Sequence, residues 1–376
     1  MDLLFWVALW GQLPSLPAPA GDEVRGFDAV DSARRRSGGS ACREDRRLTA
    51  AARDTSRALL EASDADLPDT AWTTFAARRL GVTDPGVRPF AVRYRRIDEA
   101  LRRIREAPAA GDALATHCGI GVAASGETRV LTVLSVRRSA AIDPFPVRPA
   151  LGQAALLSGR LSRGYEHPRV FVTRPDGTVE RVLMLPRARG FAASLRFDEV
   201  GSHQIEVMAD GASGPEPVAI LGAWVLTPPP DRPVVLVRPD LPEDPATVAG
   251  RLHELVGVAR ARAGLPALRP DARLARIARE HAVDMRGSRF FGHVSPTRGS
   301  LADRMRAVGL WSPRVAENVA RGPSAERIDT NVMASPAHRA NVLDALLTHV
   351  GVGVAEIAAG DIIAVMVFAT DPTDDR

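Results

Sequence analysis

Two proline-rich segments limit what this chain of 376 residues can fold into. Residues 143–149 read DPFPVRP, and residues 227–245 begin with TPPPDRP and contain further prolines. Proline fixes φ and lacks the backbone N–H, so such segments form extended spacers rather than core helices or strands. The chain is long enough for several hydrophobic cores. We therefore expect three folded regions, residues 40–142, 150–226 and 246–372, with 227–245 as a linker.

Three short motifs in the last region carry side chains that can bind metal or transfer a proton. They are FFGHVSP at 290–296, AENVA at 316–320 and MASPAHRANVL at 333–343. We expect their key residues, His293, Glu317 and His338, to lie in turns or at helix starts. Neutral imidazole and carboxylate are common ligands of an open divalent-metal site and common acid/base groups. Folding could bring the three together, whereas each histidine alone could equally bond to nearby backbone.

The pattern around these motifs predicts several helices followed by two strands. Apolar spacing predicts a helix over 252–263, which the GLP sequence at 264–266 ends. Asp271 is expected to cap the next helix, because its carboxylate can accept from free N–H groups at the helix start. Further helices are predicted over 301–308, over 328–333 and from Ser335 onward, and hairpin strands over 350–354 and 362–368.

The order of the motifs in this region resembles a known family. GLPAL at 264–268, EHAVDM at 280–285 and VGVGV at 350–354 accompany the three motifs above. Together they resemble the CAP superfamily of cysteine-rich secretory proteins, antigen 5 and plant pathogenesis-related proteins, in its bacterial SCP-like type. The resemblance covers about residues 246–370, and it implies that this region folds as an α-β-α sandwich.

The resemblance also implies a central cavity, which two histidines and two acids line in many eukaryotic members. His293, Glu317 and His338 match three of these groups, while the fourth, an acid near the position of Ser335, has no counterpart. The cofactor expected in such a cavity is Zn²⁺ or another divalent cation. The other polar residues of the motifs, which we expect to support the cavity, are Ser295, Asn318, Ser335, Arg339 and Asn341.

The middle region, residues 150–226, reads as β structure. Its short runs of apolar and β-branched residues are 156–161, 169–173, 179–185, 191–197, 204–208 and 218–225. Turn sequences such as RPDGT at 174–178 separate them, which predicts a small immunoglobulin-like β-sandwich. The region has no cluster of histidines, cysteines or acids, so we expect a spacer or protein-binding role.

Residues 40–142 share motifs with the C-terminal region in the same order. CREDRRL at 42–48 echoes LRPDARL at 268–274, and THCGIGVA at 116–123 echoes THVGVGVA at 348–355. These matches predict a degenerate, α+β, CAP-like domain at the N-terminal side. No histidine lies between Cys42 and His117, so this copy would lack the cavity groups and serve in packing or partner binding.

The two cysteines, Cys42 and Cys118, occupy repeat positions that are apolar in the second copy. In the CAP-like fold these positions bring the start of a helix near a strand. A disulfide is therefore expected in an oxidising compartment, and two buried thiols are the alternative.

Residues 1–20 are predicted to be a signal peptide, because the apolar run at 3–10 is too short to span a membrane. Residues 21–39 are predicted to be a disordered lead-in, and no other segment reads as a membrane span. The net charge is +4, and the chain has no lysine. Aromatic residues make up only 5%, which argues against a nucleic-acid partner.

Two functions fit these patterns. The first is an exported, non-catalytic binding protein, secreted or in the periplasm or cell envelope. Its His/Glu/His cavity would hold a divalent metal or a small ligand, and its partner would be that ligand or an envelope or extracellular protein. The alternative is a metal-dependent hydrolase, a peptidase with Glu317 as the base. The absence of an HExxH pair and of a nucleophile elbow favours the first.

Overall fold

The structure is a computed structural model. It describes residues 16–61, 70–108, 110–187, 190–231, 244–357 and 361–374. The apolar run at 3–10 and most of the 227–245 linker lie outside the described residues, so these two predictions stay predictions. None of the helices in the described part is long and apolar enough to cross a membrane.

The chain divides into two compact units, and the division does not follow the proline-rich segments. Unit 1 comprises residues 1–162, 185–202 and 218–235. Unit 2 comprises residues 163–184, 203–217 and 236–376. The middle region therefore contributes strands to both units.

The first helix in the described part of unit 1 is α1 (Asp22–Arg36), so the prediction of a disordered lead-in over 21–39 is wrong. Ala29, Val30 and Ala33 recur at helical spacing and are buried, as is the guanidinium-bearing side chain of Arg34. The sequence predicts that the arginines at the end of this segment are exposed to solvent, yet Arg34 is a core residue of the fold.

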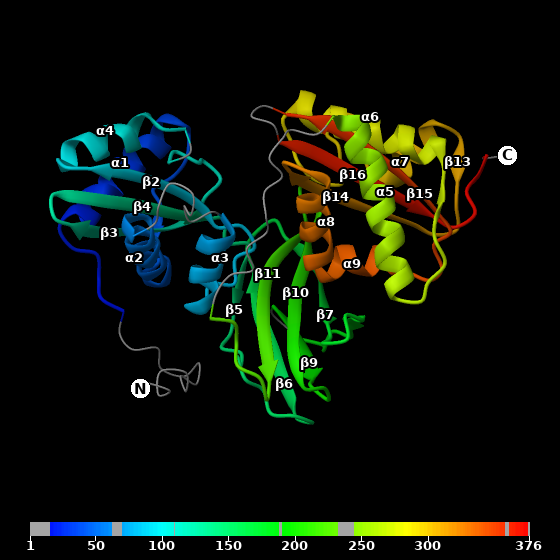
Figure 1. Ribbon diagram of the computed structural model, residues 1–376, viewed down its shortest axis with the longest axis horizontal. Helices are drawn as coiled ribbons and strands as arrows, with labels where there is room; N and C mark the ends of the chain where they lie inside the picture. The colour runs from blue at the N-terminus through cyan, green and yellow to red at the C-terminus, as the bar shows by residue number, and fades with distance from the viewer. Residues whose placement is uncertain are drawn as a thin grey trace. The chain divides into compact units, whose positions relative to one another are not determined.

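The sheet of unit 1 contains β1 (Arg43–Glu44), β2 (Arg88–Tyr94), β3 (His117–Ser125) and β4 (Thr128–Val136), in the order β1-β3-β4-β2. Strand β1 runs parallel to β3, and the other neighbours are antiparallel. The remaining helices of this part are α2 (Arg46–Glu61), α3 (Thr70–Arg79) and α4 (Ile97–Glu106). Figure 1 shows α1 and α4 together on one side of this sheet.

The predicted strands of the middle region are present. In unit 1, β5 (Ala140–Ile142), β6 (Ala154–Leu161) and β9 (Phe191–Arg196) form a three-stranded sheet. In unit 2, β7 (Glu166–Thr173) pairs with β8 (Val179–Val182) and with β10 (Gly201–Gly211), whose first two residues belong to unit 1. Strand β11 (Gly214–Val225) begins in unit 2 and ends in unit 1. The immunoglobulin-like type of this region stays a prediction.

The main sheet of unit 2 has the order β12-β15-β16-β14. Its strands are β12 (Arg269–Pro270), β14 (Val315–Gly322), β15 (His349–Glu356) and β16 (Ile362–Ala369). The helices are α5 (Pro245–Arg262), α6 (Ala272–Ser288), α7 (Leu301–Ala307), α8 (Ala325–Ala334) and α9 (Pro336–Val342). A short pair, β13 (Leu310–Trp311) and β17 (Thr373–Asp374), lies apart from this sheet.

Helices cover both faces of this sheet, which explains why β16 reads IIAVMVFA without a polar residue. Met366 and Phe368 pack in one buried cluster with residues of α5 and α8. Val365 and Val367 pack in the other, with residues of α6 and α7. The layers are therefore α-β-α (Figure 1), and the predicted pairing of β15 with β16 is confirmed.

Two glycines of the VGVGV motif let helix α6 approach β15 at backbone distance. A Cβ added to Gly351 would lie 2.1 Å from the nitrogen of Ala275, and one added to Gly353 would lie 2.0 Å from that of Arg279. In unit 1, Gly119 and Gly121 stand against α2 in the same way. No other residue type fits such a contact.

Candidate functional site

Glu317 lies on strand β14, so the prediction that it lies in a turn is wrong. It pairs with Val367 of the central strand β16. Because side chains alternate along a strand, Glu317 and Asn318 point to opposite faces of the sheet. Glu317 reaches residues of α7 and the loop before it, whereas Asn318 reaches α9.

The carboxylate of Glu317 is the centre of a buried network. Its Oε1 accepts a hydrogen bond from Nδ1 of His293 at 2.9 Å, and its Oε2 accepts one from Nη2 of Arg304 at 2.5 Å. The side chains of Arg304 and Glu317 are each 4% exposed, which makes this a buried ion pair. Since an ionised carboxylate only accepts, Nδ1 of His293 is the donor of its hydrogen bond to Glu317.

Two further contacts fix the network. Arg304 also donates to the backbone oxygens of His293 and Gly299, both at 3.0 Å. His281 of α6 is fully buried, with Nε2 at 2.9 Å from the oxygen of Gly292 and 3.9 Å from Oε1 of Glu317. His281 therefore packs beside the carboxylate, inside the core.

The charges of the network determine which groups are ionised. Burial, the largest cause, would raise the pKa of Glu317, but the hydrogen bond from His293 and the charge of Arg304 lower it overall. Burial, the largest cause, lowers the pKa of His281 against the opposing charge of Glu317. Glu317 is therefore an anion near neutral pH, and His281 is neutral.

His338 lies in the first turn of α9, and its neighbours hold the backbone there. Ser335 caps the helix by accepting from the nitrogen of His338 at 3.4 Å, and Pro336 occupies the first turn. Asn318 donates to the oxygen of His338 at 3.0 Å. Burial, the largest cause, lowers the pKa of His338 to about 3, so its imidazole is neutral near pH 7.

The other supporting residues lie at three different places. Asn341 donates to Oδ1 of Asn318 at 2.8 Å and so belongs to the β14–α9 contact. Ser295 donates to Asp284 and orders the loop that follows His293. Arg339 donates to the oxygen of Gly177, in the turn between β7 and β8.

The three key residues do not form one ligand set. Within the described ranges, no three His, Cys, Asp or Glu side chains are arranged to hold a metal ion. Both oxygens of Glu317 accept hydrogen bonds, and Arg304 neutralises its charge. Glu317 therefore suits the orientation of His293 better than direct metal binding, and the imidazoles of His293 and His338 remain as candidate ligands.

Sequence reasoning missed Glu206 of β10, a fully buried acid beside the start of α9. Its carboxylate accepts from Oγ of Ser335 at 2.9 and 3.0 Å and from the nitrogen of Ala337 at 2.8 Å. In the family pattern an acid is expected near the position of Ser335, and this sequence has none there. Glu206 of the middle region, 129 residues away in sequence, places a carboxylate beside Ser335. The only sequence signal is an acid within the apolar run QIEVM at 204–208.

A second contact from the middle region reaches the other histidine. The oxygen of Ser213, between β10 and β11, accepts from the nitrogens of His293 and Val294 at 2.8 and 2.9 Å. The segments that carry His293 and His338 are thus each bonded to the 203–217 part of unit 2.

We expect Glu206→Gln to lower the free energy of unfolding by about 1–3 kcal/mol. Both oxygens of the carboxylate accept hydrogen bonds from Ser335 and Ala337, whereas only the oxygen of an amide can accept one. Urea denaturation of the full chain measures this. Glu166→Gln, at an exposed position of β7, is the matched control and should stay within about 0.5 kcal/mol of wild type. Equal stability of the two variants would contradict a structural role for Glu206.

Comparison with known proteins places the C-terminal part in a family. Residues 253–368 match the family model of the cysteine-rich secretory protein family, CAP. Uncharacterized protein YkwD of Bacillus subtilis is 36% identical over 107 residues, 28% of this chain and 42% of that protein. Uncharacterized membrane protein YlbC of the same organism is 36% identical over 108 residues, 28% of this chain and 30% of that protein. The chain thus spans less than half the length of these two relatives.

Solved structures that the chain matches include an extracellular protein containing an SCP domain from Bacillus anthracis. That match has a TM-score of 0.32 and 16% identity, and covers 62% of this chain and 86% of the other. A cysteine-rich secretory protein from Staphylococcus aureus gives a TM-score of 0.29 and 14% identity, and covers 58% of this chain and 77% of the other. The family match itself spans His293, Glu317 and His338. The C-terminal domain of this chain is therefore a CAP-like domain of the bacterial type.

Proposed function

We propose that this protein is an exported, non-catalytic binding protein whose CAP-like domain holds a divalent cation or a small ligand at His293 and His338. One observation carries the proposal: Glu317, the candidate base, is tied to Arg304 and His293 inside the protein. A general base must be free to accept a proton from water or substrate. Glu317 instead orients the imidazole that would bind.

The state of the two histidines supports a cation as the ligand. With Nδ1 of His293 bonded to Glu317, its Nε2 would face the ion, an arrangement common among metal-binding histidines. His338 stays neutral because its pKa is lowered to about 3. Zn²⁺ binds neutral imidazole well, and water or a ligand would supply the remaining positions.

A metal-dependent peptidase is the alternative, and it needs a carboxylate that can take a proton from a bound water. Both acids near the histidines, Glu317 and Glu206, already accept hydrogen bonds from protein donors. The binding function therefore has the stronger support.

Export is supported by the Cys42–Cys118 disulfide, whose Cα atoms are 5.8 Å apart. Disulfides persist mainly in oxidising compartments such as the periplasm and the cell exterior. The description of the matched family as secretory points the same way. We infer a secreted or cell-envelope location.

We infer that the N-terminal part of unit 1 is a degenerate CAP-like copy with a packing or partner-binding role. Its sheet order β1-β3-β4-β2 corresponds to β12-β15-β16-β14. In the same register, Arg43 pairs with His117 in unit 1, and Arg269 pairs with His349 in unit 2. Pro89 pairs with Leu134 of β4, at the position where Glu317 pairs with Val367 of β16 in unit 2. A proline therefore replaces the acid in this copy.

Calorimetric titration of the metal-free full chain with Zn²⁺ tests the proposed site. We expect about one ion per chain, and His293→Ala or His338→Ala should weaken binding by more than about a hundredfold because each removes a ligand. His253→Ala, on helix α5 away from the motifs, is the control and should bind as wild type does. Stoichiometric binding that persists in the double variant of His293 and His338 would overturn the proposal.

A further inference from the structure

Unit 1 contains a pocket of about 760 Å³ beside the parallel strand pair β1–β3. Its basic lining residues are Arg34, Arg43, His117, Arg138 and Arg160. Alanines, Leu114 and Leu161 form much of the rest. None of the described residues that line it is acidic, and its volume is that of a small-molecule site.

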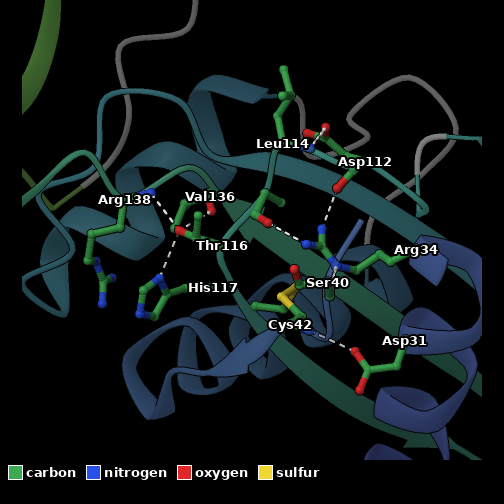
Figure 2. Close-up of a disulfide and its surroundings, with 12 residues drawn as sticks. Asp31, Arg34, Ser40, Cys42, Asp112, Leu114, Thr116, His117, Val136 and Arg138 are labelled. Carbon is green, nitrogen blue, oxygen red and sulfur yellow. Dashed lines mark hydrogen bonds between the residues drawn. A yellow bond between two sulfur atoms is a disulfide. The ribbon is translucent and has the colours of Figure 1, made fainter. Parts of the chain in front are cut away.

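The charges of this pocket are only partly compensated. Arg34 is 2% exposed and donates to the backbone oxygens of Ser40, Asp112 and Ala115. These hydrogen bonds join its guanidinium to peptide carbonyl groups and not to a carboxylate, so they do not neutralise its charge. Figure 2 shows its guanidinium directed at these oxygens near Cys42.

Carboxylates compensate one of the arginines. Arg138 pairs with Asp45 and Asp84, each at 2.8 Å. The exposed side chains of Arg43 and Arg160 form no ion pair with the described part of the chain. Four guanidinium groups therefore face two carboxylates, which leaves an excess of positive charge.

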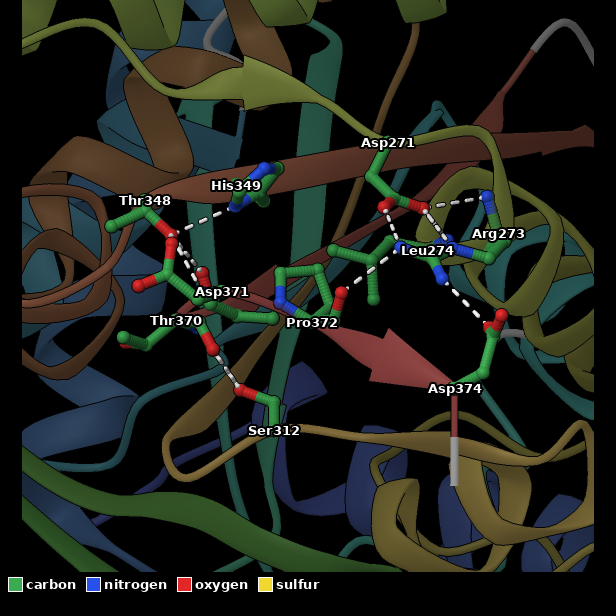
Figure 3. Close-up of polar contacts among 11 residues, drawn as sticks. Asp271, Arg273, Leu274, Ser312, Thr348, His349, Thr370, Asp371, Pro372 and Asp374 are labelled. Atoms are coloured by element: carbon green, nitrogen blue, oxygen red, sulfur yellow. Dashed lines mark hydrogen bonds and ion pairs between the residues drawn. The ribbon is translucent and has the colours of Figure 1, made fainter. Parts of the chain in front are cut away.

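Unit 2 repeats this backbone arrangement with the opposite charge. The nitrogen of Arg138 donates to Oγ1 of Thr116 at 2.8 Å, and the nitrogen of Asp371 donates to Oγ1 of Thr348 at 2.8 Å. Figures 2 and 3 show the two threonines, each bonded to Nδ1 of the histidine that follows it. An aspartate thus occupies in unit 2 the place that Arg138 has in unit 1, so the fold alone does not require a basic pocket there.

We propose that this pocket of unit 1 binds a small organic anion whose carboxylate or phosphate groups meet Arg43 and Arg160. A planar guanidinium donates two parallel hydrogen bonds to either group, so both chemistries fit the same lining. The apolar side chains of Leu114 and Leu161 would contact the carbon part of the ligand. This site is separate from the His293 and His338 site and does not depend on it.

His117 also lines the pocket, and its imidazole is uncharged near neutral pH. Burial is the main reason that the pKa of His117 is lowered, and the charge of Arg138 adds to it. Asp84 and Asp45 act in the opposite direction, and Arg43 lowers the pKa again. A neutral imidazole at this place adds one hydrogen-bonding nitrogen to the wall of the pocket.

Calorimetric titration of the full chain with citrate and, separately, with inorganic phosphate tests the proposal. We expect at least one of them to bind with a dissociation constant below about 1 mM in a buffer of matched ionic strength. Arg43→Ala and Arg160→Ala should each weaken binding about tenfold or more, since each removes a charged hydrogen bond. Binding of citrate alone would assign a carboxylate ligand, and binding of phosphate alone a phosphate ligand.

Arg269→Ala is the matched control, because Arg269 holds the place of Arg43 in unit 2. It should leave the affinity unchanged within a factor of about two. Equal weakening by Arg269→Ala and Arg43→Ala would mean general attraction to a basic surface and would overturn the proposal. The absence of binding by both anions would overturn it as well.

Discussion

Arg304→Ala is expected to lower the free energy of unfolding by about 3–5 kcal/mol, the largest loss that we predict for a single substitution in this chain. The substitution leaves the carboxylate of Glu317 buried with only the hydrogen bond from His293. It also removes the donor to the oxygens of His293 and Gly299. Urea denaturation of the full chain measures the loss. Arg306→Ala is the control, because its pair with Asp303 is exposed and should contribute less than about 1 kcal/mol.

The dependence of this effect on pH follows from the pKa of Glu317. The folded-state pKa is lowered, so the carboxylate contributes stability above its unfolded pKa, and that contribution is lost as the pH falls through the folded value. Without Arg304 the folded pKa rises. The acid transition of the variant should therefore begin at higher pH than that of wild type. An unchanged acid transition together with a loss below about 1 kcal/mol would mean that the ion pair does not stabilise the fold.

Loss of the Cys42–Cys118 disulfide is expected to lower the free energy of unfolding by roughly 4 kcal/mol in the loop-entropy account. The bond joins residues that are 76 positions apart, and without it the unfolded chain gains conformational freedom. Denaturation of the oxidised chain with and without reductant measures the change.

The repeat offers a matched variant for this test. Cys42→Leu combined with Cys118→Val places in unit 1 the apolar residues that unit 2 has at 268 and 350, both buried. This variant keeps apolar packing and removes only the covalent link. A midpoint equal to that of the oxidised wild type would show that the bond contributes nothing to stability.

The elements of the C-terminal domain follow from its sequence because their signals are local. Asp271 caps α6 as predicted, accepting from the nitrogens of Arg273 and Leu274. Ser335 and Pro336 begin α9, and β15 and β16 pair as predicted. Each of these depends on residues within a few positions of one another, or on strongly apolar runs.

The errors arise where distant contacts decide the outcome. Helix α1 was not predicted, because a run of arginines is usually exposed to solvent. Arg34 is instead buried and donates to carbonyl oxygens about 80 residues away in sequence. The polar pair Glu317 and Asn318 reads as a turn until β16 supplies its pairing partner. Glu206 could not be assigned to the site at all, because nothing near it in sequence indicates Ser335.

The way the middle region is divided has a consequence for the inheritance of this gene. Unit 2 includes residues 163–184 and 203–217, which precede the proline-rich linker. A recombination event that moved residues 246–372 alone into another protein would separate the nitrogen of Ala337 from Glu206, and that of His293 from Ser213. Selection should therefore keep the two segments together, and substitutions at position 206 should be matched by changes at the start of α9. The CAP-like domain of this chain would be inherited as part of a larger unit and not as a module that can be exchanged at the linker.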